Sequence, residues 1–193
     1  MLIKRKCRAD VRGVILFLAT VLALSALAAS AARSDQPAFE EYKVKAAYLY
    51  NIAKFVAWPE KAPTPPDSTF VIAILGQDPF GRELDTLLTD RTVGGRHIRL
   101  KRAETVAALG RCDVLFVARS LESEVHPILE QLSGRPVLTV SDMTEFGENG
   151  GMVTFYLEGD RVRFDINQEA ALKAGLTVSS RLLSLAQPHE SDR

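Results

Sequence analysis

The first periodic stretch of the chain predicts an amphipathic helix. Between Phe39 and Trp58, hydrophobic residues recur every three to four positions with lysines between them, which is the spacing of one helix face. Pro59 ends this pattern because proline cannot continue a helix. Residues 61–68, which contain three prolines, are predicted to form a loop.

The central part of the chain alternates between continuous hydrophobic runs and segments of helical pattern. Most of the runs are short and apolar, as in strands that are buried on both faces of a parallel sheet, whereas 97–102 is a shorter strand with charged residues. The predicted strands are 70–75, 97–102, 113–118 and 137–140, and the predicted helices between them are 79–88, 104–109 and 120–132. Asp78 is expected to cap the first of these helices and Pro79 to open it. This alternation predicts a single α/β domain with a mostly parallel central sheet flanked by helices.

The pattern changes after residue 151. Two segments, 152–157 and 162–166, are separated by turn residues, and the second alternates hydrophobic and charged positions. Such a pair predicts a C-terminal antiparallel hairpin at the edge of the sheet. Asn167 is expected to cap a further helix, and residues 179–185 to add a last helical turn.

The first 31 residues have the organisation of a secretory signal peptide. A basic cluster comes first, an apolar run covers residues 14–24, and small residues follow, which is the order that export requires. The apolar run is shorter than the roughly 20 residues of a membrane-spanning helix, so cleavage is favoured over a membrane anchor. We therefore expect a periplasmic protein with a cleaved segment 1–31, a flexible lead-in 32–38, a domain 39–187 and a disordered tail 188–193.

Removing the predicted signal peptide changes the charge and the cysteine count. Of the 24 basic and 24 acidic residues, five and one lie in this segment, which leaves 19 basic and 23 acidic residues and a net charge of −4. An acidic excess argues against nucleic-acid binding, which usually requires a basic surface. Cys112 alone remains, so no intramolecular disulfide can form. Its position before an apolar strand favours a half-buried, inert thiol over a reactive thiol or an intermolecular bridge.

Motifs typical of catalysis, cofactors and metal ions are missing from the sequence. Glycines at positions 76 and 81 have the P-loop spacing, but the Lys and Ser/Thr that must follow are replaced by Arg82 and Glu83. The chain has no G-x-S-x-G, H-E-x-x-H or C-x-x-C motif. Asp142 and Glu145 are possible cation ligands, but an ordinary solvated loop is the favoured interpretation. We expect no catalytic, cofactor-binding or metal-binding residues and no enzyme activity.

Three ordered blocks of the chain resemble the YfiR/HmsC-like family of periplasmic proteins. They comprise Glu41–Pro59, Ile72–Gly81, and a C-terminal block that includes Gly150–Val153, Arg161–Asn167, Gly175–Leu176 and Ser179–Leu183. The resemblance implies a compact α/β domain, often dimeric, that acts as a regulator without enzyme activity. It also implies binding to the periplasmic sensory domain of an inner-membrane diguanylate cyclase, which keeps the cyclase off, lowers cyclic di-GMP and restrains biofilm formation. The resemblance implies a prototype with disulfides, whereas the predicted mature chain, with Cys112 alone, cannot form one internally.

The predicted hairpin and the helix after it are the expected contact surface for this membrane partner. The expected contact residues are Val153, Phe155, Asp165 and Ala171. Exposed apolar side chains beside a charge would provide both affinity and orientation. A homodimer is expected as well.

The alternative hypothesis is a periplasmic sensor that binds a small ligand. Five aromatic residues crowd the first predicted helix and its end, and one helix cannot bury every face of such a stretch in a single domain. Tyr48, Trp58 and Arg181 are therefore the candidate pocket residues of this alternative.

Overall fold

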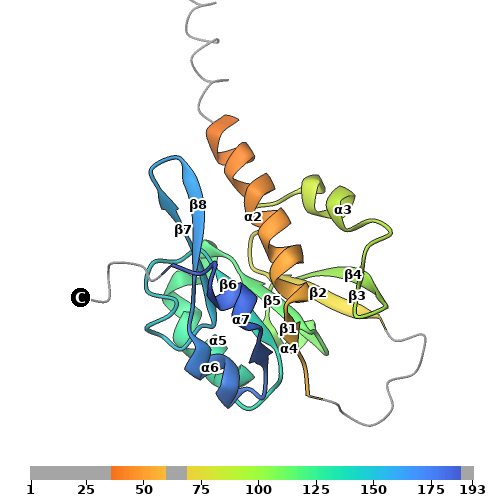
Figure 1. Ribbon diagram of the computed structural model, residues 1–193, viewed down its shortest axis with the longest axis vertical. Coiled ribbons are helices and arrows are strands. Elements are labelled where there is room, and N and C mark those ends of the chain that lie inside the picture. Colours follow the sequence, from red (N-terminus) through yellow and green to blue (C-terminus); the bar gives the residue numbers. More distant parts are fainter. Residues whose placement is uncertain (1–35, 60–68, 188–193) are drawn as a thin grey trace, which may run out of the picture. The chain divides into compact units, whose positions relative to one another are not determined.

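The computed structural model describes residues 36–59 and 69–187 (Figure 1). The described residues from Glu41 onward belong to one compact unit. The predicted signal peptide and C-terminal tail lie outside the described residues. Helix α2 (Gln36–Lys54) begins three residues before its predicted start and includes the end of the expected lead-in. In the part of the chain that the structure describes, no helix is long and apolar enough to span a membrane.

A seven-stranded sheet in the order β3-β4-β2-β5-β6-β7-β8 organises this unit. The five inner strands are parallel, and each outer strand is antiparallel to its neighbour. The predicted α/β class with a mostly parallel sheet is thus confirmed. The strands are β2 (Phe70–Leu75), β3 (Thr92–Val93), β4 (Arg96–Ala103), β5 (Val114–Val117), β6 (Leu138–Ser141), β7 (Val153–Glu158) and β8 (Arg161–Ile166).

Two hydrophobic clusters cover opposite faces of the sheet, because successive side chains of a strand point to opposite sides. In β2, Ile72 and Ile74 belong to the cluster under α2, whereas Ala73 and Leu75 belong to the cluster under α4 and α5. The remaining helices are α3 (Arg82–Leu88), α4 (Val106–Leu109), η1 (Arg119–Glu124), α5 (Val125–Leu132), α6 (Gln168–Lys173) and α7 (Ser180–Leu183). Burial on both faces explains why the central strands read as continuous hydrophobic runs.

Strands β7 and β8 pair as an antiparallel ladder that runs from Val153↔Ile166 to Glu158↔Arg161. Strand β7 also pairs with β6, so that only β8 lies at the edge of the sheet. After the ladder, Asn167 caps α6 as predicted, since its Oδ1 accepts a hydrogen bond of 2.9 Å from the Ala170 N–H.

Two local features differ from the sequence-based expectation. Asp78 does not cap α3; its Oδ1 accepts a hydrogen bond from the Phe80 N–H at 2.8 Å within a separate turn. Gly81, with a φ of 56°, follows that turn and α3 begins only at Arg82. A second, two-stranded sheet joins β1 (Val56–Ala57) to β9 (Thr177–Val178). Strands of two residues are too short to produce a hydrophobic period in the sequence.

Candidate functional site at the carboxyl edge of the sheet

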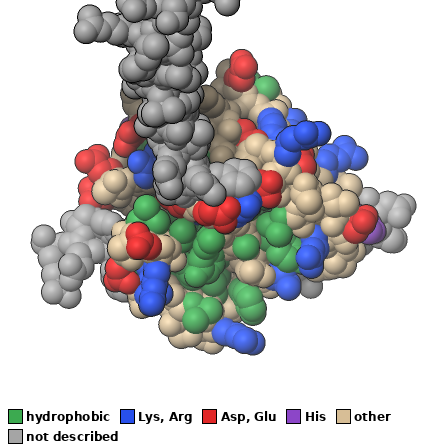
Figure 2. All heavy atoms as spheres, turned by 90° about the horizontal axis from the view of Figure 1, so that it is seen from above, with side chains coloured by type: hydrophobic (Ala, Val, Ile, Leu, Met, Phe, Trp, Pro, Cys, Tyr) green, Lys and Arg blue, Asp and Glu red, His purple; other side chains and the backbone are tan. Residues whose placement is uncertain are grey.

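The carboxyl ends of the parallel strands bring together charged residues from three segments. Arg119 follows β5, Asp142 follows β6, and the first half of α2 supplies Glu41, Tyr42 and Lys45. We call these five residues the carboxyl-edge cluster. Figure 2 looks onto this end of the unit and shows acidic and basic side chains next to one another. In open α/β sheets, functional sites form at this edge.

The centre of the cluster is a buried ion pair between Lys45 and Asp142. The Lys45 Nζ lies 2.6 Å from Asp142 Oδ2, and each side chain is only 1% exposed. Glu41, one helical turn before Lys45, forms a second ion pair with the same ammonium group. The Tyr42 hydroxyl donates a hydrogen bond of 2.7 Å to Asp142 Oδ2. The pair therefore ties α2 to the end of β6 across 97 positions of sequence.

Arg119 approaches Asp142 from the surface, with a side chain that is 60% exposed. Its Nη2 donates a hydrogen bond of 2.6 Å to the Asp142 main-chain oxygen. Its Nε lies 3.3 Å from Asp142 Oδ1 but does not form a hydrogen bond with it. Oδ1 is thus a buried carboxylate oxygen that accepts no hydrogen bond from any residue in the described ranges.

The titration properties of the cluster reflect this arrangement. Burial alone would raise the pKa of Asp142, but the hydrogen bonds from Lys45 and Tyr42 and the positive charge of Arg119 outweigh it, so the pKa lies below its usual value. Burial and the adjacent Asp142 carboxylate raise the pKa of the Tyr42 hydroxyl well above its usual value. Asp142 is therefore a carboxylate and Tyr42 a neutral phenol at neutral pH.

A cavity of about 460 Å³ opens beside the cluster. All five cluster residues line it, and β7 forms the opposite wall. The remaining lining residues are Thr144, Thr154, Phe155, Tyr156 and Leu157. The cavity thus combines charged groups on one side with apolar and hydroxyl-bearing groups on the other.

Two exposed apolar residues, Val44 and Leu157, adjoin this cavity, and we call them the apolar step. The ring of Tyr48 lies 6.2 Å from that of Phe155, so α2 covers β7 at this point. One turn towards the start of α2 comes Val44, which is 45% exposed, and two residues further along β7 comes Leu157, which is 50% exposed. Because α2 and β7 run in opposite directions, both residues lie on the same side of the Tyr48–Phe155 contact.

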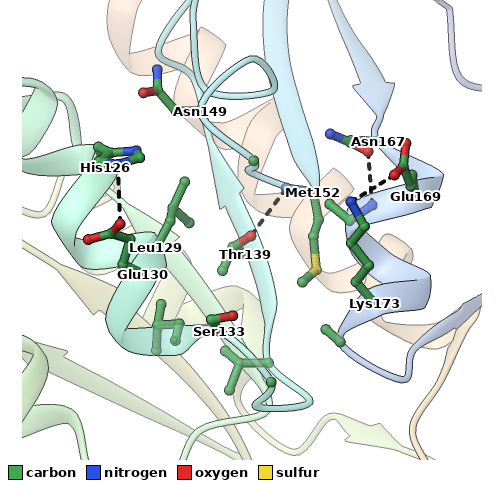
Figure 3. A pocket seen from close by; sticks show the side chains of 16 residues that line it. His126, Leu129, Glu130, Ser133, Thr139, Asn149, Met152, Asn167, Glu169 and Lys173 are labelled. Atoms are coloured by element: carbon green, nitrogen blue, oxygen red, sulfur yellow. Dashed lines mark hydrogen bonds and ion pairs between the residues drawn. The ribbon is translucent and has the colours of Figure 1, made fainter.

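A second pocket, of about 560 Å³, lies at the other end of the sheet between α5, α6 and the loop before β7 (Figure 3). Its charged groups already form pairs at the surface: His126 faces Glu130 at 3.4 Å, and Lys173 faces Glu169 at 2.7 Å. Met152 lies between these pairs and contributes the apolar part of the lining. The pocket combines apolar and polar groups and is wide enough for a small molecule.

The residues predicted for the partner surface occupy different environments. Val153 and Phe155 are 1% exposed and Ala171 is fully buried, all within the core under α2. The expectation that their side chains are exposed is therefore wrong, because α2 covers this face of β7. Asp165 is half-buried, and its Oδ1 accepts a hydrogen bond from the Ile166 N–H.

The three residues predicted for a ligand pocket do not come together in one place. Tyr48 is half-buried against Phe155 and Phe164, and Trp58 is half-buried, with its ring perpendicular to Phe70. Arg181 is exposed and lies over the Phe55 ring, 5.7 Å from its centroid. None of the three lines either pocket described above.

The sequence analysis missed the carboxyl-edge cluster because it assigned Asp142 to a solvated loop. One signal for it was present. Lys45 lies three residues after Tyr42 and four before the buried Leu49, so it falls on the stripe of α2 that packs against the sheet. A lysine on a buried stripe requires a carboxylate partner, and an aspartate directly after a buried strand is suited to supply one.

The turn after β2, which has the glycine spacing of a phosphate site, is closed in the structure. Ser120 fills it, and its Oγ accepts a hydrogen bond of 2.9 Å from the Gln77 N–H. A Cβ atom on Gly76 would lie only 2.7 Å from the same Oγ. Ser120 therefore packs into the space beside Gly76.

The lone thiol is buried, and burial raises the pKa of Cys112. This environment disfavours the thiolate that oxidation and disulfide exchange require. Within the described residues, no group of three potential metal ligands from His, Cys, Asp and Glu comes together.

The fold and the carboxyl-edge cluster define an α/β domain whose polar cavity and apolar step are suited to binding. The chain belongs to the YfiR/HmsC-like family, whose sequence model matches residues 42–187. This family is known for periplasmic, non-catalytic regulators of diguanylate cyclases. The matched region covers most of the chain and includes all of the carboxyl-edge cluster except Glu41.

Proposed function

We propose that this protein is a periplasmic, non-catalytic regulator that binds the periplasmic sensory domain of an inner-membrane diguanylate cyclase. Binding represses the cyclase, which lowers cyclic di-GMP and restrains biofilm formation. The match to the YfiR/HmsC-like family over residues 42–187 carries this proposal. A protein on the periplasmic side of the membrane acts on a cytoplasmic output only through a membrane-spanning partner, and a sensory domain provides that connection.

The contact surface that we propose is the apolar step formed by Val44 and Leu157. Both side chains are about half exposed, whereas Val153, Phe155 and Ala171 from the original hypothesis are buried beneath the surface. Apolar side chains beside a rim of charges are typical of protein–protein contacts. Here, the neighbouring Arg119 and Glu41 provide charges that orient the partner.

The test replaces both step residues with acidic ones, Val44→Glu and Leu157→Asp, and measures binding and signalling. The partner domain to be tested is the periplasmic sensory domain of an inner-membrane diguanylate cyclase from the same organism. We expect the double variant to lose binding in a titration and, in cells, to raise cyclic di-GMP to the level of a deletion strain. Leu172→Asp on α6 is the matched control, because Leu172 is 57% exposed and lies away from the step in sequence and fold.

The outcomes separate the surface from the function. If Leu172→Asp abolishes binding as fully as the double variant, the step is not the contact surface. If deletion of the gene leaves cyclic di-GMP unchanged and no membrane sensor is bound, the regulatory function itself is rejected. The proposal includes a homodimer, which sedimentation analysis of the purified protein tests directly.

A second candidate function is a sensor for a small ligand, and the pocket between α5 and α6 favours it. Its volume of about 560 Å³ and its mixed lining fall within the range of small-molecule sites. A ligand that binds the folded state raises the unfolding temperature by mass action. A screen of periplasmic metabolites should therefore identify one that stabilises the protein, and Met152→Trp, which fills the pocket, should remove the effect.

A further inference from the structure

The carboxyl-edge cavity contains an acceptor without a donor. The Asp142 side chain is 1% exposed and lines the cavity of about 460 Å³. Its Oδ1 atom accepts no hydrogen bond from the described residues. A buried carboxylate oxygen without a donor carries a desolvation cost. The cavity is therefore prepared for a group that donates a hydrogen bond.

The charge of the cluster selects the kind of donor. The inner part consists of the carboxylates of Glu41 and Asp142 around the single ammonium of Lys45, which leaves one negative charge in excess. Arg119 compensates this charge only from outside, because its side chain is 60% exposed and its Nε is 3.3 Å from Oδ1 without a hydrogen bond. A second cation that entered the cavity would be a better partner for Oδ1 than Arg119.

The free oxygen and the cavity wall favour an ammonium group over a guanidinium group as the second cation. Asp142 Oδ2 is already occupied by Lys45 and Tyr42, so only one carboxylate oxygen is available. A single oxygen suits the compact ammonium group better than the guanidinium fork, which pairs with two oxygens. The opposite wall contains Phe155 and Leu157, against which an aliphatic chain is able to pack.

We propose that the carboxyl-edge cavity binds a primary ammonium group on an aliphatic stem, with the ammonium on Asp142 Oδ1 in place of the Arg119 guanidinium. The stem lies along Leu157, and the hydroxyl groups of Thr144 and Thr154 face the same cavity. The inference goes beyond the proposed function and does not depend on it. The same chemistry has two sources, a free diamine and the lysine side chain of a protein.

Titration calorimetry with two probes tests the site on the purified protein. The probes are 1,5-diaminopentane, a free diamine, and lysine blocked at both its backbone ends, which represents a protein side chain. We expect both to bind the wild type weakly and Arg119→Gln about tenfold more tightly, because the competing cation is gone. Glu41→Gln should weaken binding, since it removes the excess negative charge but keeps the Lys45–Asp142 pair.

Arg163→Gln is the control for the change in net charge. Arg163 pairs with Glu158 on the hairpin at 3.0 Å and does not line the cavity, so its loss should leave amine affinity unchanged. Binding of the diamine alone supports a free metabolite as the source, and binding of the blocked lysine as well supports a protein side chain.

Three results would overturn the proposal. The first is that neither amine binds the wild type or Arg119→Gln. The second is that Arg119→Gln binds the amines more weakly than the wild type. The third is that inorganic phosphate stabilises the wild type but not Arg119→Gln, which would mark an anion site on Arg119. A gain of amine affinity in Arg119→Gln, together with unchanged cyclic di-GMP on gene deletion, would uphold this site and reject the regulatory function.

Discussion

A buried aspartate lies at each of the two edges of the sheet, and the two carboxylates differ in the hydrogen bonds that they accept. At the amino edge, Asp113 precedes β5 and receives the Arg96 guanidinium as a fork, with distances of 3.1 Å to Oδ1 and 3.0 Å to Oδ2. The Val71 N–H adds a hydrogen bond of 2.7 Å to Oδ2. At the carboxyl edge, Asp142 concentrates its partners on Oδ2 and leaves Oδ1 without a hydrogen bond among the described residues.

The difference indicates a structural role for Asp113 and a binding site at Asp142, which has an oxygen able to accept a further hydrogen bond. Asp113 connects β2, β4 and the start of β5, and both its oxygens are used, so a ligand would have to displace bonds that hold the sheet. Asp142 also holds the fold together through Lys45, but its side chain lines a cavity and its Oδ1 accepts no hydrogen bond from the described residues. Burial alone therefore does not identify a functional carboxylate; the hydrogen-bond inventory of both oxygens does.

The largest expected effect comes from breaking the Lys45–Asp142 pair on one side only. Asp142→Ala should lower the free energy of unfolding by about 3 kcal/mol, because a buried ammonium loses its main partner and only Glu41 remains beside it. The double variant Lys45→Met, Asp142→Leu should recover most of this loss, since no buried charge is left. Urea denaturation of Lys45→Met, Asp142→Leu and the double variant measures the coupling between the two residues. A double variant as unstable as Asp142→Ala would show that the pair is not the source of the effect.

The matching change at the amino edge should have a smaller effect. Asp113→Asn is expected to cost about 2 kcal/mol, because the amide oxygen still accepts the Val71 N–H but its NH₂ group replaces an acceptor of the Arg96 fork. Urea denaturation again provides the measurement. Arg96→Lys should be nearly as harmful, since an ammonium group lacks the planar fork that donates two parallel hydrogen bonds to one carboxylate. Full stability of Arg96→Lys would contradict the fork as the stabilising element.

The contrast between the edges also indicates how much of the molecule could be predicted from its sequence. Segments such as Phe70–Leu75 carry their strand assignment in a local run of hydrophobic residues, and the cap Asn167 acts on the residue three positions away. These predictions are confirmed. The Lys45–Asp142 pair depends on contacts between residues 97 positions apart, and neither segment contains information about the other.

The hairpin shows a different kind of failure. Its pairing was predicted from the pattern, but its exposed face was not, because the hydrophobic residues of a strand do not show which element covers them. Helix α2 covers Phe155 through Tyr48, and this places the residues expected at the surface inside the core. Leu157, two residues after Phe155 on the same strand, is 50% exposed.

The stability that Asp142 provides through Tyr42 depends on pH. Its hydroxyl group donates to Asp142, and burial together with this carboxylate raises its pKa. Because the folded state holds the phenol proton more tightly, the stabilisation is complete below about pH 10, the value for an unfolded tyrosine, and is lost as the pH rises towards the higher pKa of the folded state. Tyr42→Phe should cost about 1.5 kcal/mol at pH 7.

The measurement for Tyr42 is urea denaturation as a function of pH, between pH 7 and 11. The difference between the wild type and Tyr42→Phe should shrink as the pH rises above 10. Tyr50→Phe is the control, because the Tyr50 hydroxyl meets only a main-chain oxygen at 3.4 Å. A difference that stays constant up to pH 11 would show that Asp142 does not hold the Tyr42 proton.

The smallest effect is expected for Arg119→Gln, and it provides the sharpest contrast with Arg96→Gln. The Arg119 side chain is 60% exposed and that of Arg96 is 19% exposed. An exposed ion pair contributes less than about 1 kcal/mol, so Arg119→Gln should change the free energy of unfolding by about 0.5 kcal/mol, whereas Arg96→Gln should cost about 2 kcal/mol because it leaves both Asp113 oxygens short of donors. Equal losses in urea denaturation would mean that both arginines are structural. A small loss for Arg119 alone means that its contact with Asp142 is held weakly enough for another cation to replace it.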